Sequence, residues 1–121
     1  MMGDLVKHAG VTFPAFIADY ASNDAEVRRV EDDTMAPTLK TGDWVLIDRS
    51  SDKIPTLDCG YSVFLIRAHG CEMYRRVGDM PGDRYCVYCD NAGRYDPLWQ
   101  PKRDDVEILG RVRFCLARPI C

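Results

Sequence analysis

Short runs in which hydrophobic and polar residues alternate account for most of the chain beyond residue 26. An alternation of period two is typical of β-strands, and the run at 61–67 is strongly apolar. Glycine, proline and aspartate separate the runs, as they do at turns. Strands are predicted at residues 27–31, 44–48, 61–67, 71–77, 85–90 and 106–116. No segment has the period of an amphipathic helix, so the pattern predicts an all-β fold of six to seven mostly antiparallel strands.

The first 25 residues lack this regular pattern. Their most apolar part, residues 11–17, contains Pro14, which cannot donate a hydrogen bond to a neighbouring strand and therefore argues against a central strand. We interpret residues 1–25 as an N-terminal arm and residues 26–121 as the domain. A bend is expected in the last long strand at Gly110, because glycine weakens a strand interior.

Composition narrows the class of protein. A chain of 121 residues is long enough for a single hydrophobic core, and 46% of its residues are apolar. With 16 basic and 19 acidic residues, the net charge of -3 gives no general attraction to nucleic acid. No pair of adjacent amphipathic helices offers a helix-turn-helix, so DNA binding would need a domain outside this chain. No apolar run approaches the length of a membrane span, which favours a cytoplasmic protein without membrane contact.

The six cysteines do not form a convincing metal or disulfide pattern. Cys86 and Cys89 have the spacing of half a zinc site, but residues three apart on a strand point to opposite faces. No second pair of matching spacing accompanies them. We expect reduced, partly buried cysteines, and neither a metal nor a cofactor.

The segment between the first two predicted strands carries the strongest motif. It reads EDDTMAPTL at residues 31–39 and KTGD at 40–43. This resembles the nucleophile segment of the LexA-like (S24) and signal-peptidase-like (S26) Ser/Lys peptidases, in which a serine precedes Met-x-Pro. The resemblance places Thr34 at the nucleophile position. Asp90-Asn91 and the strand around Gly110 favour the LexA-like and phage-repressor branch, and the resemblance implies that branch's β-rich fold.

The same resemblance places Arg75 at the position of the lysine base. A neutral lysine accepts the proton of the hydroxyl nucleophile, whereas a guanidinium stays protonated and has no lone pair to offer. The two departures together indicate a site that no longer cleaves, in which Arg75 could hold Thr34 or Asp33 in place. A base relocated to another lysine is the alternative. The lysines are Lys7, Lys40, Lys53 and Lys102.

Self-cleaving members of the branch commonly cut an Ala-Gly bond ahead of the nucleophile. This chain has Ala9-Gly10, which is the possible cleavage site. The stretch from Gly10 to Thr34 is short for this purpose, so the match could also be vestigial or coincidental.

The resemblance implies the C-terminal oligomerisation and regulatory domain of a phage-type transcriptional repressor. Its partners would be a second or further copy of itself and an antirepressor protein. The long last strand is expected at a sheet edge, where it could pair with its own copy. Its interface candidates are Ile108, Val112, Phe114 and Leu116. The alternatives are a self-cleaving peptidase that uses Thr34 and a free-standing UmuD-like accessory protein.

Overall fold

The computed structural model describes residues 25–50, 62–91 and 98–115 in full, and the backbone of three short strands at 5–8, 11–14 and 118–119. Within these residues the fold is all-β, as the sequence predicts, with one short 3₁₀ turn at Arg103–Asp105. No helix in the described part of the chain has the length and apolar character needed to cross a membrane. The strands are β1 Leu5–His8, β2 Val11–Pro14, β3 Ala25–Arg29, β4 Trp44–Asp48, β5 Ser62–Ala68, β6 Cys71–Met80, β7 Arg84–Tyr88, β8 Glu107–Cys115 and β9 Arg118–Pro119.

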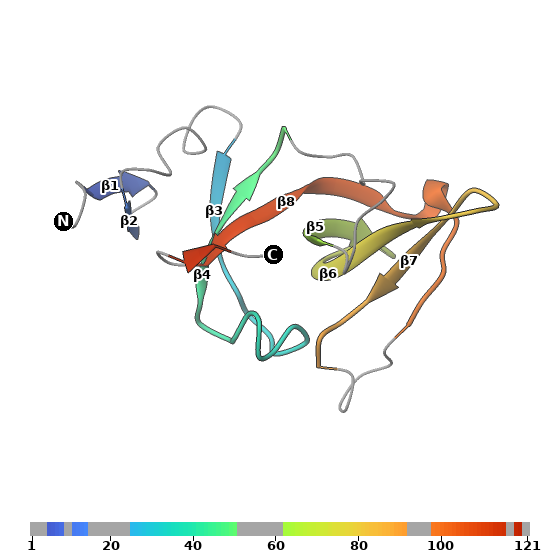
Figure 1. Ribbon diagram of the computed structural model, residues 1–121, viewed down its shortest axis with the longest axis horizontal. Coiled ribbons are helices and arrows are strands. Elements are labelled where there is room, and N and C mark those ends of the chain that lie inside the picture. Colours follow the sequence, from blue (N-terminus) through green and yellow to red (C-terminus); the bar gives the residue numbers. More distant parts are fainter. Residues whose placement is uncertain are drawn as a thin grey trace.

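One antiparallel sheet forms the body of the molecule (Figure 1). Its order is β3-β4-β8-β5-β6-β7, and β9 pairs with the end of β8. The strands β1 and β2 pair with each other in a separate hairpin. β4 has the bounds that the sequence predicts, and β6 continues three residues beyond the predicted end, to Met80.

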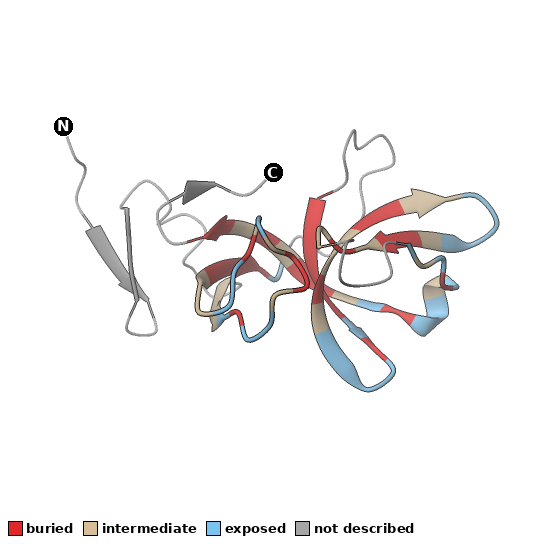
Figure 2. Ribbon diagram, turned by 90° about the horizontal axis from the view of Figure 1, so that it is seen from below, coloured by how far each residue is buried: buried red, intermediate tan, exposed pale blue. Residues whose placement is uncertain are grey.

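β5 has a strongly apolar sequence, and all of its residues except Arg67 are buried (Figure 2). Val63 and Leu65 belong to the larger hydrophobic cluster, whereas Phe64 and Ile66 belong to a second cluster. Because successive side chains of a strand point to opposite faces, the two clusters lie on opposite faces of β5. The chain therefore has a core on each side of its central strands.

The last long strand is central and not at an edge, so that expectation is wrong. β8 pairs with β5 through residues 107–111 and with β4 through residues 111–115, so it lies inside the sheet. Val112 is fully buried and Phe114 is 8% exposed, because both pack into the cores that these neighbours complete. Ile108 is half-buried against the second cluster, and Leu116 lies outside the described residues.

The predicted break at 68–70 is a two-residue hairpin turn. Ala68 pairs with Cys71, and His69 and Gly70 both have positive φ angles of 54° and 75°. Two successive positive φ angles define a type I′ turn, whose twist matches that of the flanking strands. This tight turn fixes the register of β5 against β6, and thereby places Arg75 opposite Phe64.

Candidate functional site

The candidate site is built on the loop between β3 and β4, which is anchored by its apolar side chains. Met35 and Leu39 are both buried in the larger core. They are four residues apart on a single turn, closed by a hydrogen bond from Leu39 N to Met35 O of 2.9 Å. This turn holds the preceding residue, Thr34, against the core, where it is only 6% exposed.

The hydroxyl of Thr34 is held between an arginine and a carboxylate. The Arg75 Nη1 donates to Thr34 Oγ1 at 2.9 Å, and Thr34 Oγ1 donates to Asp32 Oδ1 at 2.8 Å. Asp32 Oδ1 also accepts from the Thr34 backbone N–H at 3.1 Å. Arg75 is therefore a donor to the hydroxyl, and the group that accepts the hydroxyl proton in this hydrogen-bonded set is Asp32.

Two residues just beyond the end of β7 fasten this loop to the sheet. Asn91 N donates to Thr34 O at 3.0 Å, and Asn91 Nδ2 donates to Asp33 O at 3.0 Å. Asp90 accepts a hydrogen bond from the Thr38 hydroxyl. Its carboxylate also accepts two hydrogen bonds from the Arg76 guanidinium, from Nε at 2.7 Å and from Nη2 at 3.0 Å. The Asp90-Asn91 pair singled out in the sequence thus holds the loop in shape.

The structure describes only some of the other sequence-predicted candidates. Ala9, Gly10 and Lys53 fall outside the described residues, as does the side chain of Lys7. Lys40 and Lys102 are described and exposed, and neither is one of the groups that hydrogen-bond the Thr34 hydroxyl.

Cys86 and Cys89 are buried and reduced. In the described ranges, no group of three or more histidine, cysteine, aspartate or glutamate side chains is placed to hold a metal ion.

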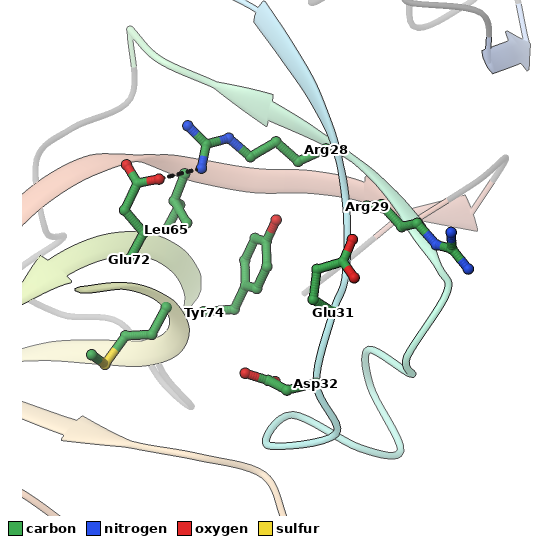
Figure 3. A pocket seen from close by; sticks show the side chains of 8 residues that line it. Arg28, Arg29, Glu31, Asp32, Leu65, Glu72 and Tyr74 are labelled. Atoms are coloured by element: carbon green, nitrogen blue, oxygen red, sulfur yellow. Dashed lines mark hydrogen bonds and ion pairs between the residues drawn. The ribbon is translucent and has the colours of Figure 1, made fainter.

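An open pocket of about 230 Å³ lies beside Asp32, between the end of β3 and the first half of β6 (Figure 3). Tyr74 points into it, and the Arg28–Glu72 pair spans it. Its lining residues are Arg28, Arg29, Glu31, Asp32, Leu65, Glu72, Met73 and Tyr74. The pocket therefore combines an apolar lining from the sheet with charged side chains of both signs.

Arg28 and Glu72, which line the pocket, belong to a longer chain of alternating charges. Arg28 contacts Glu26 and Glu72, the latter at 2.5 Å, and Arg67 continues the chain from Glu72 at 3.2 Å to Glu107 at 2.8 Å. The hydrogen bond from Arg28 lowers the pKa of Glu72 below its usual range. These ion pairs link β3 to β6 although the two strands are not neighbours in the sheet.

The burial of Tyr74 makes the stability of the folded chain depend on pH in the alkaline range. Burial raises the pKa of Tyr74 from 10.0 to about 12. Between these two values the unfolded chain loses the tyrosine proton and the folded chain keeps it, so stability falls as the pH rises. We expect the denaturation midpoint of the wild type to drop between pH 10 and pH 12, and a Tyr74→Phe variant to drop less. A Tyr85→Phe variant is the control, and an equal pH response in wild type and Tyr74→Phe would contradict the assignment.

Sequence reasoning missed two parts of this arrangement. Asp32 carries a signal, since an aspartate two residues before a threonine is typical of a turn in which the carboxylate accepts local hydrogen bonds. The Arg28–Glu72 contact has no signal in the sequence, because the two residues are 44 positions apart and lie on strands that do not pair with each other.

The chain matches one protein-family model, described as Peptidase S24-like, over residues 6–113. That span includes the loop with Thr34, the strand with Arg75 and nearly all of β8. No curated protein matches the chain. The predicted boundary between arm and domain near residue 25 lies within the matched region and stays a prediction.

Proposed function

Since the chain belongs to the Peptidase S24-like family, we propose that it is the C-terminal oligomerisation and regulatory domain of a phage-type transcriptional repressor and does not cleave itself. The observation that carries the loss of cleavage is the 2.9 Å hydrogen bond from Arg75 Nη1 to Thr34 Oγ1. A peptidase of the Ser/Lys type needs a proton acceptor at this point, and a guanidinium is a permanent donor. DNA binding would come from a helix-turn-helix domain outside this sequence, and induction from an antirepressor protein.

Restoring both family residues tests this proposal. The double change Thr34→Ser with Arg75→Lys is expected to produce slow self-cleavage at alkaline pH, where a desolvated lysine is neutral and can take the serine proton. Thr34→Ser alone should stay inert, because Arg75 remains a donor. Intact mass spectrometry over several hours distinguishes the two variants. Cleavage by the single variant would show that the base is not residue 75.

Self-association would use one face of the sheet, since β8 lies inside the sheet. Leu46 and Phe114 are buried there, and the half-buried side chains of Ala25, Val27 and Trp44 surround them. A half-exposed apolar cluster at the end of β8 is suited to an interface between two copies of the chain.

Placing a charge in this cluster should weaken association. We expect Val27→Lys to raise the dimer dissociation constant by about tenfold or more, because a lysine would be desolvated at the interface. Leu98→Lys is the matched control, since Leu98 is 54% exposed and lies outside the cluster. Sedimentation equilibrium over a concentration series measures both variants. A wild-type chain that remains monomeric at high concentration would refute the association role.

A self-cleaving peptidase is the second candidate, and one contact favours it. The Thr34 hydroxyl donates to the Asp32 carboxylate at 2.8 Å, so Asp32 could accept its proton. Dependence of any cleavage on Asp32 as well as on Thr34 would identify this route. A free-standing UmuD-like accessory role remains the third candidate, and the sequence upstream of Met1 in the gene decides it.

A further inference from the structure

The sheet curves so strongly that two strands far apart in its order approach each other. Four strand-to-strand steps separate β3 from β6, through β4, β8 and β5. In a flat sheet these steps would place the two strands about 19 Å apart. Instead, Arg28 Nη1 on β3 donates to Glu72 Oε1 on β6 at 2.5 Å. β3 and β6 are not paired through their backbones, so side chains join them here (Figure 3).

The contacts that join β6 to β3 and to the segment after it differ in burial. Beyond the end of β3, the hydroxyl of Thr34 accepts from Arg75 at 2.9 Å, and Thr34 is buried and fastened by Asn91. The side chains of Arg28 and Glu72 are 30% and 31% exposed. Exposed ion pairs contribute little to stability and are weakened by dissolved salt, whereas buried contacts are screened much less. We therefore expect the pocket to open at Arg28 and Glu72 while the contact at Thr34 persists.

Opening at this point would uncover side chains that are buried in the closed pocket. Tyr74 and Leu65 line the pocket, and they are 9% and 1% exposed. Both belong to the larger hydrophobic cluster. Tyr74 follows Glu72 by two positions on β6 and therefore lies on the same face of the strand. Movement of β3 away from Glu72 would bring water to the Tyr74 ring.

We propose that Arg28 and Glu72 form an ionic latch, which holds β3 against β6 and covers Tyr74 when closed, and opens the pocket when broken. Access to the pocket then depends on ionic strength, because dissolved ions compete with the pair. The contacts of Arg28 with Glu26 and of Glu72 with Arg67 hold the two side chains in position for each other. This inference goes beyond the proposed function, since it concerns access to the pocket and neither self-association nor cleavage.

Acetylation of the Tyr74 phenol by N-acetylimidazole measures the opening, because the reagent modifies tyrosines that water reaches. Peptide mass spectrometry separates Tyr74 from Tyr88, a half-buried tyrosine on β7 that serves as the internal reference. The wild type is compared with Glu72→Gln and with Glu107→Gln. Glu107 is the matched control, because its pair with Arg67 joins β8 to β5, two strands that already share backbone pairing.

We expect Glu72→Gln to raise the ratio of Tyr74 to Tyr88 acetylation about fivefold, the change that corresponds to the upper end of the range for an exposed ion pair. Glu107→Gln should leave the ratio unchanged. In the wild type, about 1 M NaCl should raise the ratio, because charges are then screened beyond about 3 Å. The same salt should have little further effect on Glu72→Gln, in which the latch is already broken.

An unchanged ratio in Glu72→Gln would overturn the proposal, as would an equal rise in Glu107→Gln. A parallel rise of Tyr74 and Tyr88 acetylation would also count against it, because a local latch exposes Tyr74 alone. Arg28→Gln removes the other half of the pair and should give the same rise as Glu72→Gln. If neither variant folds by circular dichroism, the salt response of the wild type decides the question, and a ratio that does not change with salt would contradict the latch.

Discussion

Replacing Arg76 with alanine is expected to lower the free energy of unfolding by about 3–5 kcal/mol, the usual range when one partner of a buried ion pair is removed. Arg76 and Asp90 are 16% and 14% exposed, and two hydrogen bonds join them. Without the guanidinium, Asp90 would remain a largely buried carboxylate with the Thr38 hydroxyl as a weaker partner. Urea denaturation at neutral pH measures the change.

An exposed arginine on the neighbouring strand provides the comparison. Arg67 also contacts carboxylates, those of Glu72 and Glu107, but its side chain is 48% exposed. Arg67→Ala should therefore cost less than about 1 kcal/mol, as surface ion pairs usually do. Equal losses for Arg67→Ala and Arg76→Ala would contradict the role assigned to the buried pair. A double change of Arg76 and Asp90 to alanine should cost less than the sum of the single changes, because no unpaired charge is left behind.

Gly110→Ala is expected to destabilise the domain by about 2–3 kcal/mol, the upper part of the range for overpacking a close-packed site. A Cβ at this position would lie 2.8 Å from Asp48 O, 2.8 Å from Ile47 Cγ2 and 3.2 Å from Arg49 Cα. Two of these atoms belong to the backbone, so a side-chain rotation cannot relieve the contact. β8 and β4 would have to separate at the centre of the sheet.

Gly70→Ala distinguishes crowding from backbone strain. Gly70 lies in the hairpin turn with a φ of 75°, and an added Cβ there would meet no atom within 4 Å. Its replacement should cost only the conformational penalty of about 1 kcal/mol. Thermal or urea denaturation of both variants gives the comparison. A Gly110→Ala loss no larger than that of Gly70→Ala would mean that the strands yield easily at this point.

Much of the fold follows from local sequence, and the errors have a physical cause. The bounds of β4 were predicted correctly because turn residues flank a short apolar run, although its last four residues are all buried and do not alternate. The position of β8 in the sheet could not be inferred from the strand itself, since a long apolar strand suits a protected edge as well as a centre. Gly110 was the available signal, because a glycine within a strand often marks the close approach of another backbone, and here that backbone is Asp48–Arg49.

The candidate site, like the fold, was predicted from the sequence only in part. Residues Thr34 and Arg75 were paired through a family pattern, and the structure brings them to 2.9 Å although 41 positions separate them. The contact of Thr34 with Asp32 was predictable from spacing but was overlooked. The approach of β3 to β6 was not predictable, because it comes from the order and curvature of the whole sheet.

The most direct test of a Thr34 site without a lysine base is the intact mass of the purified chain after prolonged incubation at about pH 9.5, where both folded and unfolded Tyr74 remain largely protonated. The arrangement of Thr34 and Arg75 predicts a single species with the mass of the full chain. Fragments corresponding to a cut between Ala9 and Gly10 that Thr34→Ala abolishes would contradict it. Loss of those fragments with Asp32→Asn would then identify Asp32 as the proton acceptor.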